Sequence, residues 1–151
     1  MNFNPQPGDI IYADRGLYKH YGIYSDDLHV IHFAAEQGEE INATNAYIYE
    51  TTLEKFLKGN AGFVDNTSLA QYSPQEIIRR ARANIGTGKG DYNLMFHNCE
   101  HFARWCKTGK AYSIQVRNAI TTTAAVAGTI VSGLVINNIA KKNHDKNRKK
   151  S

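Results

Sequence analysis

Short stretches rich in β-branched and aromatic residues, bounded by turn-forming residues, recur in the first half of the chain. This pattern is typical of β-strands. Five such stretches are present, at residues 10–12, 18–24, 28–33, 46–51 and 61–65. The second and third are separated by the polar segment Ser25-Asp26-Asp27, so we expect them to form a hairpin.

Helical patterns follow further along the chain. Three helices are predicted, at residues 52–58, 73–85 and 98–107, each followed by a glycine that can end it. The middle helix has the clearest start, because Ser73 can cap it, Pro74 suits its first position and Glu76 completes a capping box. The body of the chain, residues 1–117, is therefore predicted to be one mixed α and β domain.

The charge is unevenly distributed. The 151 residues include 18 Lys/Arg and 14 Asp/Glu, which gives a net charge of +4. Six of the basic residues and one acid lie in residues 141–151, so this tail carries +5, whereas the other 140 residues carry 12 basic and 13 acidic side chains. The tail therefore explains the basic balance, and no nucleic-acid partner is predicted.

A long uncharged segment, residues 118–140, precedes the basic tail. As a helix it would be about 34 Å long, enough to cross a hydrocarbon core of about 30 Å. Threonines and asparagines dilute it, so an interfacial helix or a helix packed on the body are the alternatives. We expect membrane association through a single-pass C-terminal anchor.

With only two cysteines and no apolar signal-peptide core, we expect the body to face the cytosol.

Two histidines fall in one frame of the predicted hairpin. If Ser25-Asp26-Asp27 is the turn, His20 and His32 lie directly opposite each other and share one face of the sheet. The opposite face collects the apolar residues Tyr21, Ile23, Ile31 and Phe33. Taken alone, the pair could be two surface histidines on a half-exposed hairpin.

Cys99 gives this pair a chemical context. It begins the predicted helix at residues 98–107, with Asn98 as a suitable cap. A thiol at a helix N-terminus faces the positive end of the dipole, which lowers its pKa and favours the nucleophilic thiolate. His20 would be the general base and His32 the residue that orients it. Cys106 lies on the apolar face of the same helix and is expected to be an inert core residue.

The alternative is a metal site built from His20, His32 and Cys99, with His97 or His101 as a further ligand. The chain has no paired C-x-x-C or H-x-x-x-H spacing that would support such a site. No metal and no cofactor is therefore predicted.

Four sequence blocks stand out when they are taken together: Pro7-Gly8-Asp9-Ile10-Ile11, Tyr18-Lys19-His20-Tyr21-Gly22-Ile23-Tyr24, Val30-Ile31-His32 and Asn98-Cys99-Glu100-His101-Phe102. Together they resemble the lecithin:retinol acyltransferase-like family, and in particular its small phospholipase A/acyltransferase branch. The resemblance implies a circularly permuted papain-like thiol hydrolase fold of the α+β class. It also implies a catalytic triad of Cys99, His20 and His32. Arg15 and Tyr18 match family positions as well, where substrate contact and simple packing are both open roles.

The function implied by the resemblance is a thiol-dependent phospholipase A/acyltransferase. Such an enzyme would move a fatty acyl chain from a glycerophospholipid through a Cys99 thioester to water, a phosphatidylethanolamine amine or a lysophospholipid. Two alternatives remain, a thiol peptidase or amidase of the same fold and a non-catalytic membrane-interaction protein. The sequence leaves open the acyl acceptor (retinol included), the acyl position cleaved, the head group, the organelle and the oligomeric state.

Overall fold

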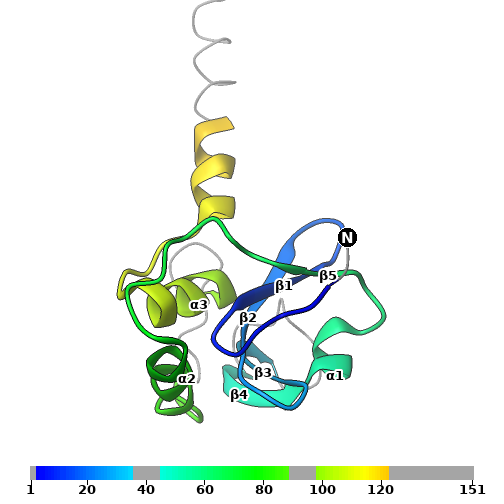
Figure 1. Cartoon of the computed structure of the whole chain (residues 1–151). Helices are drawn as coiled ribbons and strands as arrows, with labels where there is room; N and C mark the ends of the chain where they lie inside the picture. The colour runs from blue at the N-terminus through cyan, green and yellow to red at the C-terminus, as the bar shows by residue number, and fades with distance from the viewer. Residues whose placement is uncertain (1–2, 36–44, 89–97, 123–151) are drawn as a thin grey trace, which may run out of the picture. The chain divides into compact units, whose positions relative to one another are not determined.

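A computed structural model describes residues 3–35, 45–88 and 98–122 of the chain. Its centre is an antiparallel sheet of five strands in the order β4-β3-β2-β1-β5 (Figure 1). The strands are β1 (Ile10–Asp14), β2 (Lys19–Tyr24), β3 (His29–Ala35), β4 (Ala46–Thr52) and β5 (Gly62–Val64). All five coincide with stretches predicted from the sequence, and the α+β class is confirmed.

The hairpin of β2 and β3 forms as predicted, but its register is shifted by two residues. His32 lies opposite Gly22, and not opposite His20. The prediction failed because the turn is longer than Ser25-Asp26-Asp27. Leu28, expected to begin the strand, lies in the turn with a left-handed φ of 62°. A shift of two residues leaves every side chain on its predicted face, so His20 and His32 still share one.

The helices are α1 (Leu53–Leu57), α2 (Pro74–Arg82) and α3 (Cys99–Thr108). Ser73 caps α2 by accepting the backbone N–H of Glu76, but the predicted capping box is incomplete. The Glu76 carboxylate instead pairs with Arg79 at 2.7 Å, one turn further along the helix. Helix α2 also ends at Arg82, before the predicted end at Ile85, because residues 83–86 form a turn.

The two faces of the sheet are covered by different helices. The larger core cluster joins one face to α2 and α3, and it contains Tyr21, Ile23, Ile31 and Phe33, as the sequence predicted. The smaller cluster lies on the other face, where Phe56 of α1 packs against Ile11, Ala13 and Val30. The start of α3 therefore lies against β2, the strand that carries His20.

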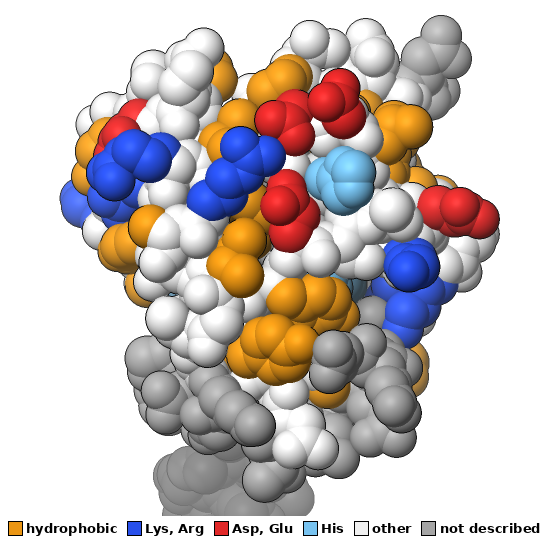
Figure 2. Space-filling model, turned by 90° about the horizontal axis from the view of Figure 1, so that it is seen from below, with side chains coloured by type: hydrophobic (Ala, Val, Ile, Leu, Met, Phe, Trp, Pro, Cys, Tyr) orange, Lys and Arg blue, Asp and Glu red, His pale blue; other side chains and the backbone are white. Residues whose placement is uncertain are grey.

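Charges of both signs are interspersed on the body. Figure 2 shows both Lys/Arg and Asp/Glu side chains on the face seen from below, next to a hydrophobic patch. This agrees with the nearly neutral charge of residues 1–140.

The chain divides into two compact units, Met1–Ser113 and Ile114–Ser151. In the second unit, residues 114–122 are helical. The rest of the predicted anchor, residues 123–140, and the tail at residues 141–151 lie outside the described residues. Among the residues that are described, no helix is long and apolar enough to cross a membrane.

Candidate active site

The two predicted histidines are in direct contact on the α1 face of the sheet. His20 Nε2 and His32 Nδ1 are 2.8 Å apart, and the two rings meet edge to face at 82°. Both side chains are buried. The contact is diagonal, and Gly22 makes room for it. A Cβ atom on Gly22 would lie 3.2 Å from His32 Cβ and 2.5 Å from a methyl group of Val30.

Helix α1 forms the wall behind the histidines. The ring of Phe56 lies 5.2 Å from that of His20 and 5.4 Å from that of His32. Arg15 fixes this helix in place by donating from Nη1 to the carbonyl of Leu57 at 2.9 Å and from Nη2 to that of Phe56 at 2.7 Å. Of the two roles left open for Arg15, the structure supports packing, because its guanidinium binds the last carbonyls of α1.

The environment of His20 keeps its imidazole neutral. Burial, together with the positive charges of Arg15 and Lys58, lowers the pKa of His20 from 6.5 to about 3. A neutral imidazole has one N–H donor and one acceptor nitrogen. If His20 donates from Nε2 to His32 Nδ1, its own Nδ1 is the acceptor, which is the state a general base requires.

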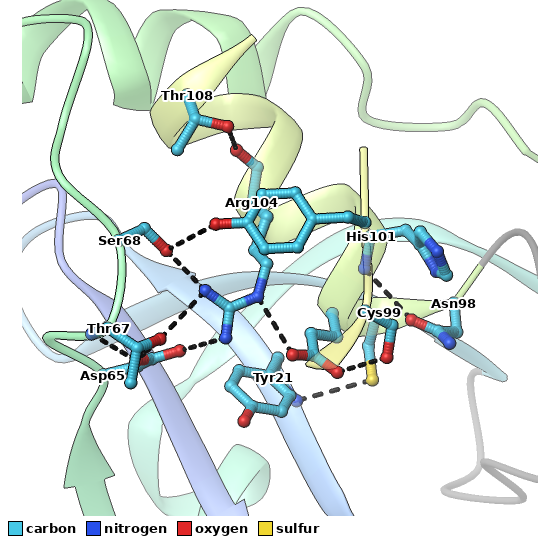
Figure 3. Close-up of polar contacts among 12 residues, drawn as sticks. Tyr21, Asp65, Thr67, Ser68, Asn98, Cys99, His101, Arg104 and Thr108 are labelled. Carbon is cyan, nitrogen blue, oxygen red and sulfur yellow. Dashed lines mark hydrogen bonds and ion pairs between the residues drawn. The ribbon is translucent and has the colours of Figure 1, made fainter. Parts of the chain in front are cut away.

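Cys99 is the first residue of α3, as the sequence predicted. Asn98 caps the helix by accepting the backbone N–H of His101 at 3.0 Å. The buried Sγ of Cys99 accepts a hydrogen bond from the backbone N–H of Tyr21 at 3.4 Å (Figure 3). Since Tyr21 follows His20 in β2, the thiol lies against the strand that carries the expected base.

The structure brings His20 and His32 together on the α1 face of the sheet, whereas Cys99 belongs to the core cluster of the opposite face and reaches β2 through the backbone of Tyr21. Within the described part of the chain, no hydrogen bond reaches Nδ1 of His20. The thiol contacts the backbone of β2, and the imidazole of His20 contacts His32. The proton-transfer contact between Cys99 and His20 is therefore not formed in this structure.

A buried ionic cluster next to Cys99 was not predicted from the sequence. Arg104 Nε binds Glu100 at 2.9 Å, and Arg104 Nη2 binds Asp65 at 2.7 Å (Figure 3). Arg104 also donates to Ser68, and Ser113 donates to Glu100. We call these five residues the Arg104 cluster. All of them are buried, and they tie the first turn of α3 to the loop that follows β5.

Two pKa values reflect this buried charge. Burial alone would lower the pKa of Arg104, but its hydrogen bond to Glu100 and the charge of Asp65 raise it above the ordinary value. Burial also raises the pKa of Tyr21, and the charges of Glu100 and Asp65 add to the rise. The guanidinium of Arg104 therefore stays charged, and the phenol of Tyr21 stays protonated.

Only part of the Arg104 cluster has a signal in the sequence. Glu100 and Arg104 are four residues apart, the spacing at which opposite charges pair on a helix. Asp65 is separated from Arg104 by 39 positions, and no periodic pattern links the two residues.

The second cysteine lies in a different environment. Cys106 is buried in the core between α3 and the sheet. Burial raises the pKa of its thiol to about 12, so the thiolate is not populated at neutral pH. This agrees with the inert role expected for Cys106.

The metal-site alternative can be examined for His20, His32, Cys99 and His101. Within residues 3–35, 45–88 and 98–122, no group of three or more His, Cys, Asp or Glu side chains is arranged to hold a metal ion. His97, the remaining candidate ligand, lies outside the described residues.

Comparison with known proteins places this arrangement in a family. The family model described as lecithin retinol acyltransferase matches residues 3–112. The chain belongs to this family. It is 36% identical over 137 residues to human phospholipase A and acyltransferase 3, covering 82% of this chain and 83% of that protein. It is 33% identical over 138 residues to human phospholipase A and acyltransferase 1, covering 84% of this chain and 82% of the relative. The corresponding rat protein is 30% identical over the same length and the same shares.

The family match covers nearly the whole first unit of the chain. It includes β2, β3 and the start of α3, which carry His20, His32 and Cys99. The family and the names of the relatives support an acyltransferase or phospholipase A function at the level of the family.

Proposed function

We propose that this protein is a thiol-dependent phospholipase A/acyltransferase with Cys99 as nucleophile, His20 as general base and His32 as the residue that orients the base. The observation that carries the proposal is the 2.8 Å contact between His20 and His32 beside a helix that begins with Cys99. A thiol at a helix start, a neutral imidazole and a polar orienting residue are the parts that acyl transfer through a cysteine requires.

In the first step, His20 Nδ1 takes the proton of the Cys99 thiol, and the thiolate attacks the ester carbonyl carbon of a glycerophospholipid. The bond from this carbon to the glycerol oxygen breaks, and the leaving oxygen takes the proton from His20. A lysophospholipid leaves, and the acyl chain remains on Cys99 as a thioester. In the second step, the oxygen or nitrogen of an acceptor attacks the carbonyl carbon of the thioester, and the bond from this carbon to the Cys99 sulfur breaks. His20 takes the acceptor's proton and returns it to the Cys99 sulfur.

The electrostatics around His20 fit a base that is charged only briefly. Its burial, together with Arg15 and Lys58, disfavours the imidazolium in the resting site. A thiolate on Cys99 would favour the imidazolium, because an opposite charge nearby raises the pKa of a histidine. The backbone N–H of Tyr21, which binds Sγ at 3.4 Å, would stabilise the same thiolate.

The acceptor is water, a phosphatidylethanolamine amine or a lysophospholipid, and the proposal covers all three. We further propose the circularly permuted papain-like arrangement as the fold and residues 118–140 as a membrane anchor, with the body on the cytosolic side. The order of the site residues supports the first, because both histidines precede the cysteine. The uncharged run and the basic tail support the second.

The decisive experiment is intact-mass analysis of the protein after incubation with phosphatidylcholine vesicles. We expect a mass increase of one acyl chain, located on Cys99 by peptide mapping and sensitive to hydroxylamine. Cys106→Ser is the matched control and should acquire the same adduct, whereas Cys99→Ala should acquire none. A protein that turns over vesicle lipid without Cys99, or that never carries the adduct, would contradict the proposal.

A further inference from the structure

A mostly apolar pocket of about 400 Å³ lies along α3, on the side next to β3 and β4. Its apolar lining residues are Phe33, Ile48, Phe102, Trp105 and Ala111. Polar groups enter the lining through Thr87, Asn98 and His101. The volume falls within the range of pockets that hold small organic ligands, about 300–1,000 Å³.

The lining of the pocket begins at the residue that precedes Cys99. Asn98, the cap of α3 and the residue bonded to Cys99, is part of its lining. Three of its apolar walls, Phe33, Ile48 and Phe102, belong to the same core cluster as Cys99. From Asn98, the pocket runs along α3 to Trp105, which at 1.5 Å per residue is about 10 Å.

The rim of the pocket is held by the backbone. Ile48 of β4 donates to the carbonyl of Thr87 at 3.0 Å and accepts from Gly86 at 2.8 Å. Gly88 follows with a left-handed φ of 83°, and a Cβ atom at this position would lie 3.0 Å from the ring of Phe33. The backbone at Gly88 therefore lies close to the wall of the pocket, and only glycine fits there without strain.

We propose that this pocket holds the fatty acyl chain of the substrate and of the Cys99 thioester, an inference that rests on the proposed function. The ester carbonyl would lie at Cys99 Sγ, and the chain would pass Asn98 and lie against Ile48 and Trp105. Burial of an alkyl chain in an apolar pocket is favourable by about 0.8 kcal/mol per methylene. The distance to Trp105 would set a preference for acyl chain length.

The single tryptophan of the chain provides a direct probe, because Trp105 lines the pocket. Dodecanoate brominated at its terminal carbon should quench the fluorescence of Trp105 in the full-length protein, with saturation. Unbrominated dodecanoate should compete without quenching. The Cys99→Ala variant should be quenched to the same extent, because binding of the chain does not need the nucleophile.

Two substitutions that fill the pocket test its location. Ile48→Phe enlarges a side chain in the wall and so narrows the pocket. Ala111→Phe adds a larger side chain at an exposed position of the lining, where it can be accommodated without disturbing the core. Each should raise the dissociation constant of brominated dodecanoate, measured from the quenching of Trp105, by at least about tenfold, equal to about 1.4 kcal/mol. Each should also shift the Cys99 adducts formed from mixed-chain vesicles toward shorter acyl groups. Ile78→Phe, the same change in a different pocket, should alter neither readout.

The outcomes separate this proposal from the proposed function. One outcome is saturable quenching that is weaker in Ala111→Phe, together with no adduct on the protein. It supports the alkyl-binding site and contradicts the acyl transfer. An adduct on Cys99 whose chain-length profile is unchanged in both filled variants, without quenching of Trp105, overturns the acyl pocket and leaves the acyl transfer standing. Equal effects of Ile78→Phe and Ala111→Phe would also overturn it.

Discussion

Replacing Arg104 by methionine removes the only cation of the Arg104 cluster and retains most of the side chain's volume. Two carboxylates, on Glu100 and Asp65, would then be buried without the guanidinium that binds them at 2.9 and 2.7 Å. Both carboxylates are nearly inaccessible to solvent, with side-chain exposures of 0% and 2%. Water therefore cannot take the place of Arg104 without a rearrangement of the core.

The magnitude follows from the desolvation of these charges. Removing one partner of a buried ion pair costs about 3–5 kcal/mol. A domain of this size has a total stability of about 5–15 kcal/mol, so the loss is a large share of it. The melting temperature should fall by about 10–20 °C.

Urea unfolding, followed by the fluorescence of Trp105 and by circular dichroism, measures this loss. Arg79→Met is the matched control, because Arg79 pairs with Glu76 on the exposed side of α2, where solvent screens the pair, and its loss should cost far less stability. Adding Asp65→Asn and Glu100→Gln to Arg104→Met should recover part of the stability, because neutral amides are less costly to bury than carboxylates.

The reasoning would be refuted by two results in particular. One is an Arg104→Met variant whose free energy of unfolding falls by no more than that of Arg79→Met. The other is a triple variant that is less stable than Arg104→Met alone. Either would mean that the carboxylates do not depend on Arg104 for their burial.

Three further predictions concern the site and the anchor. Cys99→Ser should abolish acyl transfer to vesicle lipid, whereas Cys106→Ser should keep most of it; equal losses in a phospholipase assay would reject the assignment. Because the pKa of His20 is about 3 in the folded protein and about 6.5 when unfolded, its contribution to stability is complete above pH 6.5. That contribution should decrease by about 2 kcal/mol between pH 7 and pH 5, and His20→Gln should remove this part of the pH dependence in urea titrations. Truncation before Asn118 should leave activity on detergent-dispersed lipid and sharply reduce activity on bilayers; unchanged activity on bilayers would argue against an anchor.

The local elements could be predicted from the sequence because their signals are local. Asn98 and Gly109 mark the two ends of α3, and both act as the caps expected of them. The faces of the β2–β3 hairpin were also predictable, because alternation along a strand depends only on whether a position is odd or even. The register was not, since the left-handed conformation of Leu28 in the turn has no signature in a leucine.

The parts of the site that depend on distant contacts could not be predicted. Nothing in the order of residues indicates that Asp65 will meet Arg104, or that Phe56 will form the wall behind the two histidines. These contacts arise only when the loop after β5 and helix α1 are packed on the sheet. The resemblance to the family suggested the candidate site residues, but it gave no role to Glu100, which the structure places in the Arg104 cluster.

The dependence of Cys99 on the docking of α3 has a consequence for biosynthesis. Both histidines belong to strands that leave the ribosome well before Cys99 does, and Asp65 leaves before Arg104. In the proposed mechanism, the thiol of Cys99 can approach His20 only when α3, the last helix of the first unit, packs onto the completed sheet. A nascent chain near a membrane would therefore stay chemically silent until its body is finished. Detachment of α3 in the mature protein would switch off acyl transfer while the strands remain paired.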